Sequence, residues 1–184
     1  MRIGVDIDDT LTSLSELFYT EMQKWCIERE EIDNCDKKVL TKNVYANIKE
    51  YHSFWKEVME EKVLNMECKD GAKLIIDKLL EEGHEIYLIT ARSNDYYDNY
   101  KENTVKWLKS KKINYTNIFF ECTDKRKVLS ELKIDVMIDD NKEVMDTVLD
   151  LNIKGIIMNT FFNSTYNKCD RAYTWYDVYC YIKN

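Results

Sequence analysis

Two carboxylates close to the N-terminus have the types and the spacing to hold a divalent cation. Asp6 and Asp8 lie where a short, mostly apolar run at residues 2–7 gives way to acids. Residues two apart in an extended chain point to the same side, so both carboxylates should face one cleft. Buried carboxylates are costly to keep ionised and repel each other, and oxygen ligands favour Mg²⁺ as their neutralising partner. The ordinary structural alternative is that acids at a strand end cap the following helix, here through Asp9 or Thr10.

Three further positions carry polar groups that suit chemistry on a phosphate. The apolar run at residues 85–90 ends in Thr90, whose hydroxyl can donate to a phosphoryl oxygen. Lys125 begins an expected helix, although a lone lysine on a helix is usually solvated. The pair Asp139-Asp140 follows the apolar run at residues 136–138 and offers further oxygen ligands for a metal ion.

These residues depend on an alternation of strands and helices. Strands are expected at residues 2–7, 85–90, 118–121, 135–138 and 155–158, and helices at 71–82, 97–111, 125–132, 141–151 and 175–182. Asp70 is the expected N-cap of the first of these helices and Gly83 its C-terminal stop. The alternation predicts an α/β fold with a parallel, Rossmann-like sheet and helices on both faces. Ligands of such sheets bind beyond the carboxyl ends of the strands, where all the residues above except Lys125 are expected.

One stretch interrupts the alternation. Residues 13–69 contain no convincing strand and are expected to form helices at 14–30, around 44–51 and around 54–60. We interpret this stretch as a helical cap inserted after the first strand, with residues 1–12 and 70–184 forming the catalytic core. Its aromatic side chains could stack on a nucleobase, but helical spacing favours a packed core for Trp25, Tyr45, Tyr51, Phe54 and Trp55.

The composition excludes several classes of function. The formal net charge is −7, from 27 basic and 34 acidic residues, which disfavours nucleic acid as a partner but not a small phosphorylated molecule. The six cysteines form no CxxC pair and there are two histidines, so we expect free thiols rather than a zinc site or a disulfide framework. With no signal peptide and no apolar run of membrane-spanning length, we expect a cytoplasmic protein with no membrane partner.

Taken in order, the four elements resemble the haloacid dehalogenase superfamily of phosphohydrolases. The superfamily signature DxDx[TV] is matched by Asp6, Asp8 and Thr10, and its strand-ending threonine by Thr90. Its lysine is matched best by Lys125, which lies fourteen residues before Asp139, although Lys127 is a rival. Its acidic pair is matched by Asp139 and Asp140. The segments 3–12, 88–93, 134–141 and 169–175 are similar to the 5′-deoxynucleotidase-like branch, which includes bacterial nucleotidases.

The resemblance implies a mechanism. Asp6 would attack phosphorus to form an aspartyl-phosphate, and Asp8 would protonate the leaving oxygen and then deprotonate the hydrolytic water. Mg²⁺, Lys125 and Thr90 would offset the charge of the transferring oxygens. The implied metal ligands are the Asp6 carboxylate, the Asp8 backbone carbonyl and one of the pair Asp139-Asp140.

The resemblance also implies the remaining partners of the site. Thr10, Ala91 and Arg92 are candidates for substrate binding; Arg92 either binds the substrate phosphate or pairs with surface carboxylates. The expected substrate is a small phosphomonoester, a nucleoside monophosphate above all. The alternatives are a sugar phosphate, a nucleic-acid end, or a non-catalytic binding domain, against which the complete set of site residues argues. The pattern specifies no oligomeric state.

Overall fold

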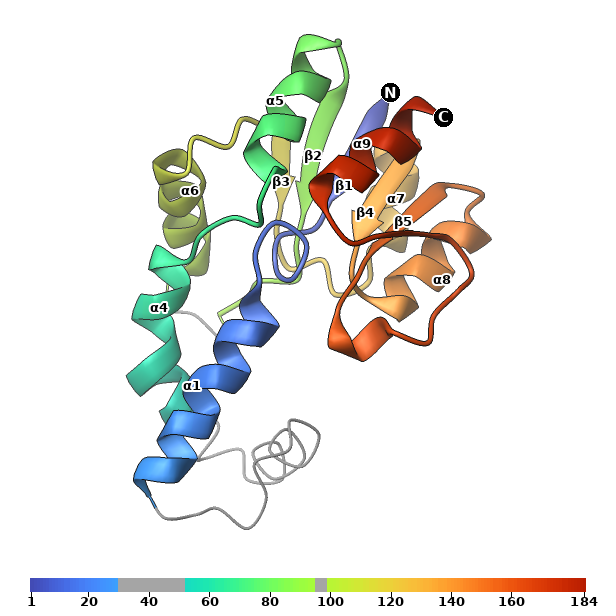
Figure 1. Cartoon of the computed structure of the whole chain (residues 1–184). Helices are drawn as coiled ribbons and strands as arrows, with labels where there is room; N and C mark the ends of the chain where they lie inside the picture. Colours follow the sequence, from blue (N-terminus) through green and yellow to red (C-terminus); the bar gives the residue numbers. More distant parts are fainter. Residues whose placement is uncertain (30–51, 95–98) are drawn as a thin grey trace.

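Six parallel strands form one sheet in the order β3-β2-β1-β4-β5-β6. The computed structural model of the chain describes residues 1–29, 52–94 and 99–184. The strands are β1 (Arg2–Val5), β2 (Glu85–Ile89), β3 (Asn117–Phe119), β4 (Val136–Asp139), β5 (Lys154–Met158) and β6 (Asp170–Ala172). Since β1 lies between β2 and β4, the segment that follows β1 leaves from the middle of the sheet, as Figure 1 shows.

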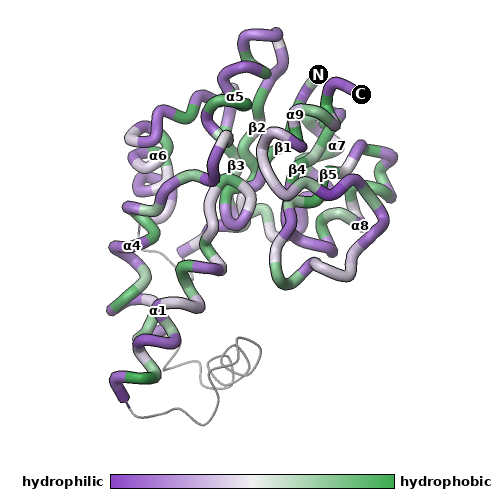
Figure 2. The backbone as a smooth tube through the Cα atoms, in the orientation of Figure 1, coloured by the Kyte–Doolittle hydropathy of each residue, from purple (hydrophilic) through white to green (hydrophobic). Residues whose placement is uncertain are grey.

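Helices cover both faces of this sheet because its strands are apolar on both sides. Ile3 and Val5 of β1 pack in a cluster with α5 (Ala72–Glu81), α6 (Tyr100–Ser110) and α9 (Trp175–Lys183). The opposite face packs against α7 (Arg126–Leu132) and α8 (Lys142–Asp150). Figure 2 shows the hydrophobic positions along the strands and the hydrophilic ones at the outer turns. The expected α/β fold is therefore confirmed.

A glycine in the central strand allows the close packing on the second face. A Cβ at Gly4 would lie 2.6 Å from Sδ of Met137 on the neighbouring strand, closer than real Cβ contacts. Glycine at this position lets β1 and β4 carry the side chains of both faces without a clash. The two strands pair in register up to Val5, which lies opposite Ile138.

The described part of the insertion between β1 and α5 contributes helices with a hydrophobic cluster of their own. These are α1 (Leu14–Glu28), a π-helical turn η1 (Trp55–Met59) and α4 (Glu60–Asn65). Phe18 and Met22 of α1 pack against Phe54 and Met59, and Tyr100 of α6 joins the same cluster. Figure 1 shows α1 and α4 extending from the carboxyl-end side of the sheet. Trp25, Phe54 and Trp55 are buried core residues, and Tyr45 and Tyr51 lie outside the described residues.

The two ends of this insertion run side by side and form a narrow neck. Thr12 and Cys68 form an isolated antiparallel bridge, and the backbone N–H of Lys69 donates to the Leu11 carbonyl at 2.7 Å. The Lys69 ammonium also donates to the Asp9 carbonyl at 2.7 Å. The insertion therefore begins and ends at almost the same point.

Some sequence expectations differ from the structure in detail. Strand β1 ends at Val5, before the acids, and the short β6, with only Ala172 buried, was not expected. The N-cap of α5 is Gly71, with a φ of +77°, rather than Asp70. Gly83, with a φ of +82°, follows the end of α5 as expected. The helix expected around residues 44–51 lies outside the described residues. The described cysteines are free thiols, as expected: Cys26, Cys68, Cys122, Cys169 and Cys180.

Candidate active site

The acidic and hydroxyl residues singled out in the sequence gather at the carboxyl edge of the sheet. Asp6 directly follows β1, Thr90 directly follows β2, and Asp139 is the last residue of β4, with Asp140 next to it. Because the three strands are adjacent and parallel, their ends meet at one edge. This edge faces the side on which α1 and α4 extend (Figure 1).

A single lysine joins the ends of β1 and β4. Lys125, the N-cap of α7, donates from Nζ to Oδ1 of Asp6 and to Oδ2 of Asp139, both at 2.6 Å. Its side chain is 3 % exposed, whereas that of the rival Lys127 is 84 % exposed and pairs with Glu131. The geometry therefore places Lys125 and not Lys127 in the site.

Carboxyl groups outnumber ammonium groups at this edge of the sheet, and their ionisation is costly there. Burial raises the pKa of Asp6 to about 8 against the lowering effect of Lys125, and the Asp139 and Asp8 charges raise it further. Burial also raises the pKa of Asp140, with Asp139 and Asp6 adding to the effect. Burial alone lowers the pKa of Lys125, but the Asp139 and Asp6 carboxylates outweigh it, so that the lysine stays charged. One cation therefore faces more carboxylates than it can neutralise.

The same carboxylates fit a divalent metal ion. Ligand oxygens of Asp6, Asp139 and Asp140 all lie within 4.8 Å of one another. Hard oxygen donors and an excess of negative charge are what Mg²⁺ requires of a protein site. The carboxylate of Asp8 is outside this group of ligands, and the expected role of its backbone carbonyl as a ligand stays a prediction.

The Asp8 carboxylate pairs instead with Arg92. Nε of Arg92 donates to Oδ2 at 2.8 Å and its second terminal nitrogen, Nη2, donates to Oδ1 at 2.6 Å, a two-pronged ion pair. The remaining terminal nitrogen, Nη1, donates to Oγ1 of Thr104 in α6 at 3.0 Å. The backbone N–H of Arg92 donates to Oγ1 of Thr90 at 3.3 Å. Of the two alternatives for Arg92, pairing with a carboxylate is what is seen, although the partner is Asp8 and not a surface acid.

The turn between Asp6 and α1 is shaped by Asp9. Its φ is +59°, and its side chain accepts hydrogen bonds from the backbone N–H, at 2.8 Å, and the hydroxyl of Ser15 in the first turn of α1. The N-cap of α1 is Ser13, whose side chain makes no capping bond, so Asp9 is not the N-cap, although its carboxylate meets a backbone N–H in the first turn. Thr10, by contrast, is fully buried, and its Oγ1 has no hydrogen-bond partner among the described residues. Its carbonyl accepts from Nε1 of Trp175 at 3.1 Å.

One charged residue of this region was missed in the sequence. Lys69 lies at the end of the insertion, where nothing in its spacing relates it to the acidic residues. In the structure its ammonium reaches the turn of Asp9, and burial lowers its pKa while the Asp9 and Asp140 charges oppose that shift. Ala91, expected to bind substrate, is exposed on the loop after β2. Its role, like the other assigned roles, stays a prediction.

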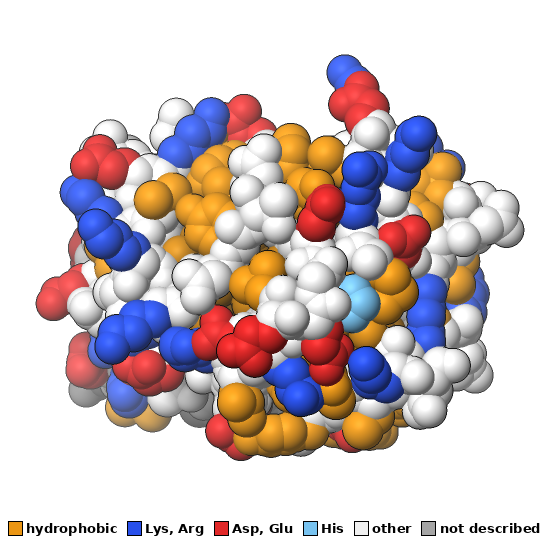
Figure 3. Space-filling model, turned by 90° about the horizontal axis from the view of Figure 1, so that it is seen from above, with side chains coloured by type: hydrophobic (Ala, Val, Ile, Leu, Met, Phe, Trp, Pro, Cys, Tyr) orange, Lys and Arg blue, Asp and Glu red, His pale blue; other side chains and the backbone are white. Residues whose placement is uncertain are grey.

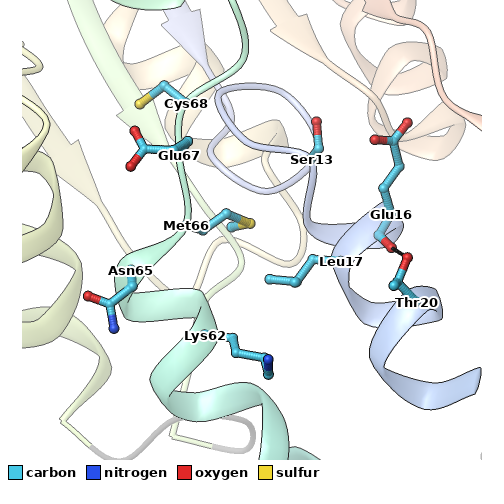
Figure 4. Close-up of a pocket in the computed structure, with 9 residues that line it drawn as sticks. All are labelled: Ser13, Glu16, Leu17, Thr20, Lys62, Asn65, Met66, Glu67 and Cys68. Atoms are coloured by element: carbon cyan, nitrogen blue, oxygen red, sulfur yellow. Dashed lines mark hydrogen bonds between the residues drawn. The ribbon is translucent and has the colours of Figure 1, made fainter. Parts of the chain in front are cut away.

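Several hollows flank the neck of the insertion, and two of them are lined by α1. An open groove of about 560 Å³ lies between α1 and α4, where Figure 4 shows Leu17 and Lys62 on facing helices. A smaller cavity of about 70 Å³ lies beside Asp9 and Lys69, and the rings of Tyr19 and Phe162 meet across it at 5.6 Å. Neither hollow is lined by the ligand residues Asp6, Asp139 or Asp140, so the carboxylate cluster is a separate site.

The fold and this site together define a phosphohydrolase of the haloacid dehalogenase superfamily. Two solved structures have the same fold. The haloacid dehalogenase-like hydrolase SP0104 of Streptococcus pneumoniae has a TM-score of 0.68 at 12 % identity, covering 98 % of this chain and 97 % of its own. The protein YfnB of Bacillus subtilis, whose structure is described as bound to magnesium, has a TM-score of 0.63 at 11 % identity, covering 100 % and 98 %.

The particular family follows from the sequence match. The profile of the family described as "5' nucleotidase, deoxy (Pyrimidine), cytosolic type C protein" matches residues 1–184, and the chain belongs to this family. The protein named "Putative nucleotidase OB0422" of Oceanobacillus iheyensis is 27 % identical over 186 residues, 96 % of each chain. The protein is thus an enzyme that hydrolyses phosphomonoesters. None of the described helices is both long and apolar enough to cross a bilayer.

Proposed function

We propose that this enzyme hydrolyses nucleoside monophosphates in the cytoplasm, with Mg²⁺ as its cofactor and Asp6 as its nucleophile. The observation that carries the proposal is the placement of Lys125 Nζ 2.6 Å from both Asp6 and Asp139, inside a cluster of carboxylates with excess negative charge. Such a cluster does not stabilise the fold by itself, because each buried carboxylate that Lys125 does not neutralise costs free energy of folding.

In the first step, an oxygen of Asp6 attacks the phosphorus of the ester in line with the leaving oxygen. A bond forms between Asp6 and phosphorus, the ester P–O bond breaks, and Asp8 gives its proton to the leaving oxygen. In the second step, water attacks the aspartyl-phosphate and Asp8 takes its proton. The bond between Asp6 and phosphorus breaks, which releases inorganic phosphate and restores the carboxylate.

The charge that develops on the transferring oxygens is met from several directions. Lys125 provides a fixed ammonium, and Thr90, buried at the end of β2, provides a hydroxyl. When bound by Asp6, Asp139 or Asp140 and the Asp8 carbonyl, Mg²⁺ supplies Lewis-acid stabilisation of the phosphoryl oxygens. We further propose that residues 13–69 act as a cap over this site and that Thr10 and Ala91 help to shape the phosphate subsite.

The family match supports a nucleotide as the substrate. The formal net charge of −7 favours a small substrate over a nucleic-acid end. Figure 3, seen from above, shows the face at the amino ends of the strands, opposite the carboxylate edge, where basic and acidic side chains are intermixed.

The test is a turnover assay with a panel of nucleoside monophosphates, sugar phosphates and para-nitrophenyl phosphate, with and without Mg²⁺. We expect turnover that requires Mg²⁺, that prefers nucleotides and that Asp6→Asn abolishes, because an amide cannot attack phosphorus. Equal turnover across the panel would contradict the nucleotide assignment but not the phosphatase mechanism. Turnover that survives in Asp6→Asn would contradict the mechanism.

A further inference from the structure

The surroundings of Arg92 give this side chain a function different from that of its neighbours at the ends of β1 and β4. We propose that Arg92 is a positioning residue: it holds the carboxyl group of Asp8 in the orientation needed for proton transfer and does not bind the substrate phosphate. The inference rests on the proposed function, since it concerns the residue to which that mechanism assigns both proton transfers.

The first argument is that every nitrogen of the guanidinium group is already in use. Nε and Nη2 donate to the two oxygens of Asp8 at 2.8 and 2.6 Å, and Nη1 donates to Thr104 at 3.0 Å. A two-pronged arginine pair fixes both the position and the plane of a carboxyl group. A phosphate that took the two-pronged Nε–Nη2 edge of Arg92 would have to displace the carboxylate of Asp8.

The second argument is the difference in exposure between the two partners. The side chain of Arg92 is 4 % exposed, while that of Asp8 is 25 % exposed. Arg92 therefore lies behind Asp8, on the protein side, and Asp8 keeps an open side. A carboxylate has about four lone-pair sites, so the two bonds from Arg92 leave sites free to receive or give a proton.

The third argument is that the arginine is itself held from a rigid element. Thr104 and Trp107 lie on α6 and are 2 % and 3 % exposed, and the guanidinium carbon of Arg92 lies 5.8 Å from the centre of the Trp107 ring. Nε1 of Trp107 donates to the carbonyl of Met66 at 2.8 Å, at the point where the chain leaves α4. The same helix thus orients Arg92 and contacts the return end of the insertion.

Correct placement of an acid should matter only when the leaving group needs a proton. The oxygen of an alkyl phosphate leaves as a strong base unless it is protonated in the transition state. The oxygen of para-nitrophenyl phosphate leaves as a stabilised phenolate and has little need of an acid. A positioning role therefore predicts a loss that depends on the leaving group, whereas phosphate binding or a purely structural role predicts the same loss for both.

The experiment compares these two substrate classes in the full chain with Mg²⁺. The alkyl substrate is the nucleoside monophosphate that the wild-type enzyme turns over fastest, and stopped-flow records the first turnover. For Arg92→Gln we expect the first-turnover rate on the nucleotide to fall about 100-fold, and the nitrophenolate burst to fall less than about fivefold. KM should stay within about threefold for both substrates, because no contact with the phosphate is lost.

Three variants check the assignment. Arg92→Lys keeps a charge but not the two-pronged pair. Its first-turnover rate on the nucleotide should be about tenfold higher than that of Arg92→Gln. In the background of Asp8→Asn, the change Arg92→Gln should add less than about threefold, because the two residues act as one unit. Arg171→Ala is the matched control. Arg171 makes four hydrogen bonds to Asn159, Asn163 and Tyr166. Its loss should affect both substrates in parallel.

Several outcomes would overturn the inference. A rise in KM of tenfold or more for both substrates in Arg92→Gln would identify Arg92 as a phosphate ligand. A parallel fall of both first-turnover rates, as in Arg171→Ala, would reduce Arg92 to a structural role. If Arg92→Gln does not fold, Arg92→Lys is read against the same two criteria. Wild-type protein that hydrolyses neither substrate would refute the proposed function itself, and is recognised before any variant is made.

Discussion

Buried carboxylates contact lysines in two regions of this molecule. In one region the carboxylates outnumber the lysines, and in the other the lysines outnumber the carboxylate. At the ends of β1 and β4, the carboxylates of Asp6, Asp139 and Asp140 share one ammonium, that of Lys125. Between the helices of the insertion, Glu21 of α1 alone receives two ammonium groups. Lys24 lies at 2.8 Å from it and Lys62 of α4 at 3.2 Å.

The pKa is raised where carboxylates outnumber lysines and lowered where lysines outnumber the carboxylate. Burial and the neighbouring acids raise the pKa of Asp6 to about 8, despite Lys125. Hydrogen bonds from Lys24 and then Lys62 outweigh burial and lower the pKa of Glu21. In the insertion, the charge of Glu21 is fully balanced by Lys24 and Lys62, and the pair with Lys62 joins α1 to α4. The cluster at the strand ends lacks positive charge, as expected of a site that takes up a cation and a phosphate.

The largest expected effect concerns the metal site. In Asp139→Asn, one ligand charge is lost while the side chain keeps its size. We expect the Mg²⁺ concentration for half-maximal activity to rise at least about 100-fold, measured by titration of Mg²⁺ in the turnover assay. The control is Asp146→Asn on α8, an exposed carboxylate that contacts Tyr166 and Lys168 outside the site. An unchanged Mg²⁺ requirement in Asp139→Asn would leave Asp140 as the ligand, and an unchanged requirement in both Asp139→Asn and Asp140→Asn would contradict the assignment.

The next effect concerns stability and separates the two lysines that compete in the sequence. Lys125→Met leaves the Asp6 and Asp139 carboxylates buried without their cation. It should destabilise the metal-free protein by about 3–5 kcal/mol in denaturant unfolding. Mg²⁺ should stabilise this variant more than it stabilises the wild type, since it replaces part of the lost charge. Lys127→Met, at a side chain that is 84 % exposed, should change stability by less than about 0.5 kcal/mol. Equal losses in both variants would refute the distinction.

The smallest effect concerns the insertion. Glu21→Gln should cost about 1 kcal/mol at pH 7 and leave kcat unchanged. Because the pKa of Glu21 is lower in the folded state, its contribution is complete above pH 4.5 and is lost as the pH falls through the lowered pKa. The difference between wild type and variant should therefore vanish on acidification, in unfolding curves recorded from pH 7 to pH 3. Glu28→Gln, on an exposed position of the same helix, should show no such difference.

The sequence predicted the strand ends well because two local signals coincide there. Apolar runs that stop at Asp6, Thr90 and Asp139 indicate both a buried strand and a polar edge, and parallel pairing then brings the edges together. Strand β6 was missed because its three residues contain no apolar run, and its pairing with β5 supplies the missing signal.

The pairing of side chains could not be predicted in the same way. Whether Arg92 meets a phosphate, a surface acid or Asp8 depends on the path of the loop after β2 and on the position of α6. The path of a loop and the position of a helix against it leave no periodic pattern in a single sequence, so neither could be predicted. Lys69 is a similar case, since only the return of the insertion to its starting point brings it to Asp9.

The narrow neck of the insertion has a consequence for how such enzymes diversify. Because Thr12 and Cys68 are bridged, a short turn would be enough to join them, and the order of the strands would not change. The sheet and its carboxylate edge are thus indifferent to the size of what is inserted between β1 and β2. If residues 13–69 form the proposed cap, exchanging them would leave the residues of the carboxylate edge in place.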